Sequence, residues 1–244
     1  MNFQSNATVV LVHGAWADGS SWSSVILPLE RAGLNAVAAP IPLTSLSDDA
    51  AALKRMLART KGPVLLAAHA YAGAVIAAVN DERVKGLVYV AALAPDEGET
   101  VAQVFYKEEP HAMAPKLAPD EWGFIWMPDD GFANAFAHRG TKEQLALAKA
   151  VQRPISVNCI QERAPKPLWK SRPAWFLIAE EDRMINPKTQ HFMAERMKAT
   201  TKSVVADHTP IMTDSDNVVD FILTAAKRVL FEGLGFAGGK SLMR

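Results

Sequence analysis

The sequence lacks several features that would place it in a specialised class of protein. It contains a single cysteine, Cys159, so no disulfide can form within the chain and an oxidising compartment is not required. Lys+Arg and Asp+Glu number 26 each, so the basic surface typical of nucleic-acid-binding or membrane-surface proteins is not expected. No apolar run approaches the roughly 20 residues of a membrane span.

Residues 1–8 also lack the charged start and apolar segment of a secretory signal. We therefore expect a cytoplasmic protein that acts on a small molecule and has neither nucleic-acid nor membrane partners, with a homodimer left open. What the chain does have is apolar residues, which make up 49% of its 244 positions. That content is enough for one large core, so we expect one domain with an insertion rather than two domains.

Short apolar runs alternate with helical patterns along most of the chain. The runs lie at 8–12, 35–39, 64–68, 86–92, 174–179 and 203–206, and the helical patterns at 20–32, 48–57, 71–79, from 186 onward and at 214–230. The runs are continuous rather than alternating in and out, which is typical of parallel strands buried on both faces. The sequence therefore predicts an α/β fold with a mostly parallel sheet and helices on both faces.

This alternation is interrupted between the fourth and fifth predicted strands. Nine of the 15 prolines and three of the six tryptophans lie between Pro95 and Pro173, and 141–144 has the capping-box pattern of a helix start. We predict that 96–172 form a helical lid inserted into a core of residues 1–95 and 173–231. Residues 232–244 contain four of the 14 glycines and are expected to form a loose tail.

The third predicted strand runs into a very tight turn, which reads Ala-His-Ala-Tyr-Ala-Gly at 68–73. Three further candidate segments follow other predicted strands, at the edge where parallel sheets bind ligands. They are His13-Gly14-Ala15-Trp16 after the first strand, Glu180-Glu181-Asp182 after the fifth and Asp207-His208 after the last. The turn, an acid and a histidine thus follow one another in the chain order of a hydrolase triad.

On these residues the chain resembles the α/β-hydrolase superfamily over nearly its whole length. It is most similar to the small bacterial branch akin to plant methyl esterases and hydroxynitrile lyases. The matching segments are 9–22, 41–49, 68–76, 86–99, 179–187 and 207–212. Such relatives usually read G-H-S-Y-G-G at the turn, where the serine is the nucleophile. Alanines at 68 and 72 keep small side chains there, whereas Ala70 stands at the nucleophile position.

The resemblance implies a role for each residue at the strand ends. His208 would be the base that takes the nucleophile's proton, and Asp182 would orient the imidazole and stabilise its cation. The backbone N–H groups of Ala15 and Tyr71 would stabilise the oxyanion. Trp16, directly after the oxyanion residue, is expected to face the substrate.

Several of these residues have competing interpretations. Asp96, which follows the fourth predicted strand, or one of the two glutamates before Asp182 could serve as the acid instead. Asp207 is expected to be a solvated charge, because adjacent residues at a strand end point apart. His13 and His69 are expected to be structural hydrogen-bonding groups in tight turns.

Two tryptophans of the middle segment and the three remaining histidines have competing interpretations as well. Trp122 and Trp126, four residues apart, could form a pocket wall that binds substrate or could simply pack within the lid. The remaining histidines show no metal-ligand spacing with acids or Cys159, so neither a metal nor another cofactor is expected. They are His111, His138 and His191.

The expected function is hydrolysis of an ester, or of an amide, carbamate or lactone, of a small and largely apolar molecule through an acyl-enzyme. With Ala70 the chain itself is expected to be inactive or nearly so and to hold substrate unreacted. An alanine that replaces a parental serine is favoured over a native one, because the rest of the machinery is intact. A natural ligand-binding protein and a hydroxynitrile-lyase-like enzyme are the alternatives. The lyase is less favoured because Ala15 lacks the hydroxyl that some such lyases place beside the oxyanion hole.

Overall fold

The computed structural model describes residues 6–231, so the predicted tail at 232–244 lies outside the described residues. Six strands form one sheet in the order β2-β1-β3-β4-β7-β8, and every neighbouring pair is parallel. The strands are β1 (Thr8–Val12), β2 (Asn35–Ala39), β3 (Val64–His69), β4 (Val84–Val90), β7 (Ala174–Ala179) and β8 (Thr200–Val204). The predicted α/β fold with a parallel sheet is confirmed.

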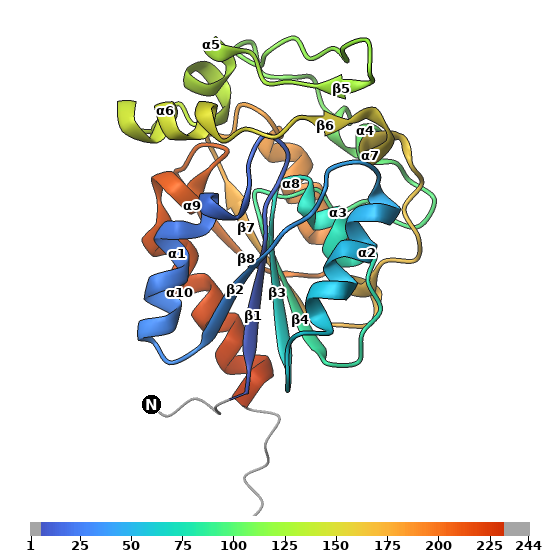
Figure 1. Cartoon of the computed structure of the whole chain (residues 1–244), viewed down its shortest axis with the longest axis vertical. Coiled ribbons are helices and arrows are strands. Elements are labelled where there is room, and N and C mark those ends of the chain that lie inside the picture. Colours follow the sequence, from blue (N-terminus) through green and yellow to red (C-terminus); the bar gives the residue numbers. More distant parts are fainter. Residues whose placement is uncertain (1–5, 232–244) are drawn as a thin grey trace, which may run out of the picture.

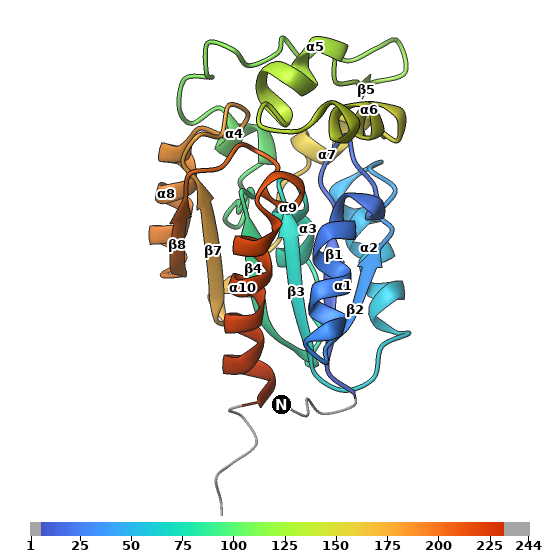
Figure 2. The same cartoon turned by 90° about the vertical axis from the view of Figure 1, so that its left-hand side faces the viewer.

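Helices cover both faces of this sheet (Figures 1 and 2). They are α1 (Ser23–Arg31), α2 (Leu46–Leu57), α3 (Ala72–Ala77), α8 (Pro187–Arg196), α9 (Pro210–Thr213) and α10 (Ser215–Ala226), with the short turns η1 (Gly19–Trp22) and η4 (Lys227–Phe231). Successive side chains of the strands point to opposite faces, so the sheet separates two apolar cores. One core contains α1 and α10, and the other contains α2, α3 and α8.

The last strand differs from its prediction at 203–206. It begins at Thr200, earlier than predicted. The prediction missed this start because the threonines there are exposed at the edge of the sheet and give no apolar signal. The strand ends at Val204, where the chain turns and the N–H of Ala206 donates to the Val204 carbonyl. The polar loop that follows therefore starts closer to the sheet than predicted.

Most of residues 96–172, which we call the lid, lie above the carboxyl ends of the strands (Figure 1). The end of this segment runs down beside the sheet, where Nε of Arg172 donates to the carbonyl of Val84, the first residue of β4. The elements of the lid are α4 (Val101–Phe105), β5 (Phe124–Ile125), α5 (Asp129–Gly131), η2 (Phe132–Phe136), α6 (Lys142–Ala150), β6 (Ile155–Ser156), α7 (Val157–Gln161) and η3 (Leu168–Lys170). Thr141 caps α6 with the predicted capping box. The antiparallel pairing of β5 with β6 was not predicted, because each strand has only two residues.

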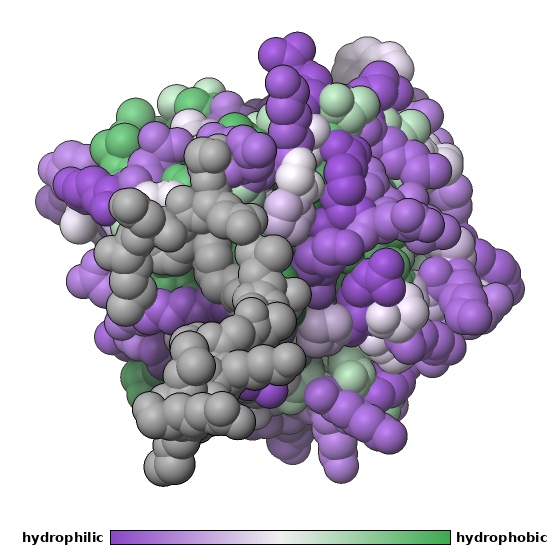
Figure 3. Space-filling model, turned by 90° about the horizontal axis from the view of Figure 1, so that it is seen from below, coloured by the Kyte–Doolittle hydropathy of each residue, from purple (hydrophilic) through white to green (hydrophobic). Residues whose placement is uncertain are grey.

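The opposite end of the molecule, below the amino ends of the strands, has a different surface. Hydrophilic residues predominate on the part of that face that Figure 3 leaves visible. No helix among residues 6–231 is long and apolar enough to cross a membrane.

Candidate active site

The turn between β3 and α3 consists of only two residues, Ala70 and Tyr71. Ala70 has a φ of 51°, in the left-handed region that residues with a side chain rarely adopt. Its carbonyl accepts hydrogen bonds from the N–H groups of Gly73, at 3.1 Å, and Leu93, at 2.9 Å. A Cβ on Gly73 would lie 2.3 Å from the Leu93 carbonyl oxygen, so only glycine allows this close packing. The turn has the strained form of a nucleophile elbow, with a methyl group at its tip.

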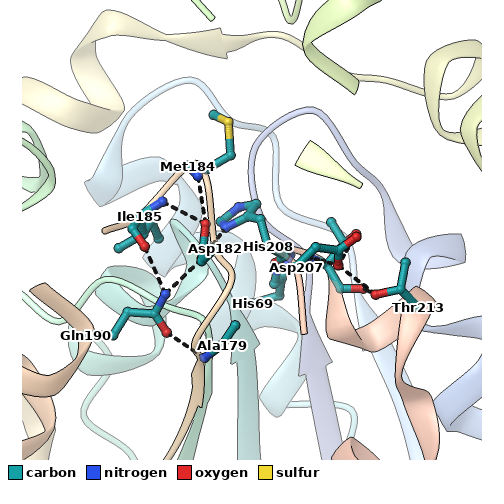
Figure 4. Close-up of polar contacts among 10 residues, drawn as sticks. His69, Ala179, Asp182, Met184, Ile185, Gln190, Asp207, His208 and Thr213 are labelled. Carbon is teal, nitrogen blue, oxygen red and sulfur yellow. Dashed lines mark hydrogen bonds and ion pairs between the residues drawn. The ribbon is translucent and has the colours of Figure 1, made fainter. Parts of the chain in front are cut away.

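His208 and Asp182 form a buried pair beside this turn. Nδ1 of His208 lies 2.8 Å from Oδ2 of Asp182. The carboxylate also accepts hydrogen bonds from the N–H groups of Met184 and Ile185, at 2.7 and 2.9 Å, and from Nε2 of Gln190, at 2.8 Å (Figure 4). A buried carboxylate needs such donors, and together they fix its position. Asp182 is thereby placed to orient the imidazole through Nδ1 and to leave Nε2 for chemistry.

The rival carboxylates are engaged elsewhere, at the protein surface. Their partners are Lys170 for Asp96, His191 for Glu180 and Arg139 for Glu181. Among the described acids, Asp182 is thus the one that pairs with His208.

The loop after β1 lies directly against the elbow. A Cβ on Gly14 would lie only 2.9 Å from the Cβ of Ala70, so glycine is required for this approach. The N–H groups of the next residue, Ala15, and of Tyr71 donate to no group within residues 6–231. Both residues line the same cavity as Ala70 and His208. Backbone N–H groups are nearly always paired, so two free ones beside the elbow match the requirement of an oxyanion hole.

The cavity lies between the sheet and the lid and has a volume of about 240 Å³. Most of its lining is apolar: Leu93, Val101, Ala102, Phe105, Leu117, Pro119, Ile125, Ile155, Val157, Ile160, Met184 and Ile185. None of its lining residues is an aspartate, glutamate, lysine or arginine. The cavity therefore suits an uncharged and largely apolar molecule.

Residues 9–221 match the model of the Alpha/beta hydrolase family. The chain belongs to this family. No curated protein matches it in sequence. Its fold is shared by polyneuridine aldehyde esterase, with a TM-score of 0.79 and 18% identity over 91% of this chain and 99% of that one. The methylesterase protein MES16 from Arabidopsis has a TM-score of 0.74 and 15% identity over 91% and 100% of the two chains. A histidine variant of tomato methylketone synthase I, complexed with beta-ketoheptanoate, has a TM-score of 0.79 and 17% identity over 91% and 98%.

The three tryptophans expected at the hydrolase pocket occupy different places. Trp16 lines the cavity, and its Nε1–H donates to the carbonyl of Ile125 at 2.9 Å. Trp122 and Trp126 are 75% and 50% exposed, and neither lines the cavity. The prediction of a pocket wall is wrong for these two, because they lie around β5 on the outside of the lid. The lid wall comes instead from α4 and α7, which are too short to show a helical period.

The prediction that Asp207 is a solvated charge is also wrong. Its side chain is fully buried, and Oδ1 accepts hydrogen bonds from the Thr213 hydroxyl, at 2.6 Å, and the Thr209 N–H, at 3.1 Å. Oδ2 accepts from the N–H of Arg139 in the lid at 2.9 Å. The argument from alternating strand residues fails because β8 has already ended. Asp207 instead joins the loop that carries His208 to the lid through Arg139. Figure 4 shows its contact with Thr213 on the other side.

His69, directly before the elbow residue, supports the same loop. Its Nε2 lies 2.7 Å from the backbone carbonyl of His208, to which it donates. Burial lowers the pKa of His69 to about 3, so its imidazole is neutral and keeps this donor at neutral pH. His13 makes a local contact, with Nδ1 3.0 Å from the Gly14 carbonyl oxygen. Both contacts are of the structural kind expected for these histidines.

One polar residue near the site was missed. Asp49, on α2, is fully buried, and its carboxyl accepts hydrogen bonds from the Tyr71 hydroxyl, at 2.8 Å, and the Leu43 N–H, at 2.7 Å. The Cys159 thiol lies 3.6 Å from the same carboxyl. Burial raises the pKa of Asp49 to about 6, and the neighbouring Asp48 adds to the rise. The sequence showed Asp49 only as one of the acids in a helix's first turn.

We expect Asp49→Asn to remove a pH dependence from the stability of the chain. The pKa of Asp49 is higher in the folded protein than its usual 3.8, so the folded state binds this proton more tightly. The stabilisation is present below pH 3.8 and is lost as the pH rises through about 6. Relative to Asp49→Asn, the original chain should therefore lose about 2.5 kcal/mol of unfolding free energy between about pH 4 and pH 7. Urea unfolding of both proteins across this range measures the difference, and parallel curves would contradict the expectation.

Within residues 6–231, no group of three or more histidine, cysteine, aspartate and glutamate side chains is arranged to hold a metal ion.

Proposed function

We propose that the site is that of a carboxylic-ester hydrolase whose nucleophile position is occupied by Ala70. The observation that carries this proposal is that a base and two hydrogen-bond donors lie around the methyl group of one residue, Ala70. The base His208, paired with Asp182, and the free N–H groups of Ala15 and Tyr71 surround the same cavity that Ala70 lines. A hydroxyl at position 70 would complete the set of groups that acyl transfer requires.

With serine at that position, the reaction would follow the acyl-enzyme route. His208 would take the hydroxyl proton, and the oxygen would attack the ester carbonyl carbon while the two N–H groups stabilise the oxyanion. The alcohol would leave with the proton from His208, and water would then release the acid. In the chain as it stands no atom at residue 70 can attack, so an ester is held and not cleaved. Amides, carbamates and lactones would use the same groups.

The substrate class follows from the cavity. Its lining carries no charged side chain, so a charged acyl or alcohol group would lose its hydration without gaining a partner. We therefore propose neutral esters with largely apolar groups, in line with the esterases among the fold neighbours. We also propose a cytoplasmic location, for which a single buried thiol, Cys159, is suitable.

The chain as it stands should bind such an ester without turning it over. The hydroxyl is not needed to fill the cavity, so calorimetry should give an affinity within about tenfold, or about 1.4 kcal/mol, of the ground-state affinity of the Ala70→Ser protein. Ala102→Trp, which fills the cavity from α4, is the matched control and should abolish binding. Equal binding by that control, or no binding of any ester that the Ala70→Ser protein cleaves, would contradict the proposed location.

A second candidate function follows from Ala70 itself. Nε2 of His208 makes no hydrogen bond within the described residues, and the two N–H donors can stabilise an enolate as well as a tetrahedral oxyanion. These groups suit a reaction without a nucleophile, and one fold neighbour is complexed with beta-ketoheptanoate. A carboxylate in this uncharged lining would lose hydration, and its departure as CO₂ would remove that cost. In a β-keto acid, the bond between the α-carbon and the carboxylate would break and CO₂ would leave. The electron pair would pass to the keto oxygen, and a proton from water would then add to the α-carbon to give the ketone and hydroxide.

The two candidates are separated by giving the unmodified chain both kinds of substrate. Release of ketone and CO₂ from beta-ketoheptanoate, lost in His208→Ala, would favour the reaction without a nucleophile. Binding of neutral esters with no reaction of the keto acid would favour the hydrolase site.

A further inference from the structure

The buried side chains of Asp49, Tyr71 and Cys159, together with the N–H of Leu43, form a connected group that we call the Asp49 cluster. The Asp49 carboxyl receives the phenol at 2.8 Å, the N–H at 2.7 Å and the thiol at 3.6 Å. Four ion pairs between a lysine or arginine and an acid are found among residues 6–231, and none of them involves Asp49. The cluster thus joins α2, the elbow and lid helix α7 through one carboxyl without a cation.

Two of the backbone segments that meet at this carboxyl are in the left-handed region. Ala70, directly before Tyr71, has a φ of 51°, and Leu43 has a φ of 61°. Such conformations persist only where the surrounding contacts hold them. The Asp49 carboxyl holds Leu43 by its N–H, and the Leu43 carbonyl in turn accepts the N–H of Ser156 in the lid at 3.0 Å.

Tyr71 is held at one end and free at the other. Its hydroxyl is fixed by Asp49 on the far side of the cavity wall, while its backbone N–H, next to Ala70, has no acceptor within the described residues. The Tyr71 N–H and the Ala70 carbonyl belong to one planar peptide unit, which the N–H groups of Gly73 and Leu93 hold through that carbonyl. The anchored phenol supplies a fixed point on the same residue.

We propose that Asp49 is a positioning residue for the oxyanion hole. By holding the Tyr71 hydroxyl it restrains the Tyr71 Cα at the far end of the peptide unit that carries the N–H, and through Cys159 it ties this residue to α7, whose Ile160 and Gln161 line the cavity. The proposal rests on the ester-hydrolase site proposed above. Asp49 acts through Tyr71 and does not contact the substrate.

The kinetic test uses the Ala70→Ser protein with a p-nitrophenyl ester. A donor that is slightly misplaced stabilises the transition state less while ground-state binding is almost unchanged, so Asp49→Asn and Tyr71→Phe should each lower kcat by about 10- to 100-fold. KM should change by less than about threefold. The combined variant should be no worse than either single one, because both remove the same link. A change in KM alone, or fully additive losses in kcat, would overturn the proposal.

Tyr89→Phe is the matched control. Tyr89 is a fully buried tyrosine of β4 whose hydroxyl has no hydrogen-bond partner within the described residues. Tyr89→Phe removes the same hydroxyl oxygen as Tyr71→Phe, but Tyr89 lies outside the Asp49 cluster, so kcat should remain unchanged. A loss of kcat equal to that of Tyr71→Phe would show that any buried hydroxyl has this effect, and would overturn the specific role of Asp49.

A second readout needs no substrate and uses the chain as it stands. If Asp49 fixes the elbow, Asp49→Asn and Tyr71→Phe should each speed hydrogen exchange by about tenfold at residues 70–74. Exchange in β1 of these two variants should stay unchanged, and so should exchange at 70–74 in Tyr89→Phe. If Ala70→Ser cleaves no ester, the hydrolase proposal fails but this measurement still tests Asp49. Unchanged exchange at 70–74 in both cluster variants would overturn the positioning role.

Discussion

Ala70→Ser should turn the chain into an esterase, with a gain in rate on the order of 10⁶. Removal of the serine of a hydrolase triad costs about that factor, or about 8 kcal/mol of barrier, so its return should recover it. The change adds one oxygen at an elbow whose backbone already has the strained φ of 51°. The base and both N–H donors already line the same cavity. Release of p-nitrophenol from a series of esters measures the gain, and mass spectrometry should find the acyl group on the peptide that contains residue 70.

Ala72→Ser provides a matched control for this experiment. It adds the same hydroxyl two residues further on, in the buried first turn of α3, where it cannot reach a substrate in the cavity. It should remain inactive. A folded Ala70→Ser protein that cleaves no ester or aryl amide would contradict the hydrolase proposal, and equal activity in both variants would contradict the assignment of the elbow.

His208→Ala and Asp182→Asn should each abolish most of the activity of the Ala70→Ser protein. Loss of the base should cost about 10⁶ in kcat, and loss of the carboxylate about 10⁴. The NH₂ of an amide at 182 would face either Nδ1 of His208 and Nε2 of Gln190, which both contact Oδ2, or the N–H groups of Met184 and Ile185, which donate to Oδ1. In the first orientation the imidazole would adopt the wrong tautomer, and in the second two donors would lose their acceptor. Because the two residues act as a unit, the double variant should be no slower than His208→Ala alone.

Asp96→Asn is the matched control for the carboxylate. Asp96 was the main rival acid in the sequence, but it pairs with Lys170 at the surface. Its amide variant should keep full activity in steady-state assays of the Ala70→Ser protein. If Asp96→Asn lost activity while Asp182→Asn kept it, the assignment of the acid would be wrong.

The sheet and the edge that carries the site could be predicted because parallel strands leave a simple record in sequence. A strand that is buried on both faces must be apolar throughout, and the residues after such strands must meet at one edge. That reasoning placed Ala70, Asp182 and His208 together before any contact was known. It failed at Thr200, where the edge strand β8 is exposed and polar.

Burial of polar residues could not be predicted in the same way. Asp207 and Asp49 are both fully buried, although their neighbours in sequence give no sign of it. Each has one partner from a distant segment, since Arg139 is 68 positions from Asp207 and Cys159 is 110 positions from Asp49. Only the folded lid brings these donors to the carboxyls. The same holds for Trp122, whose exposure depends on how the short strand β5 pairs.

A crystal structure of the unmodified chain with an intact neutral ester bound would test the proposed site most directly. The carbonyl oxygen should accept hydrogen bonds of about 3 Å from the N–H groups of Ala15 and Tyr71. The carbonyl carbon should face the Ala70 methyl, with the rest of the ester beneath α4 and α7. An ester bound elsewhere, or with its carbonyl turned away from both N–H groups, would contradict the account.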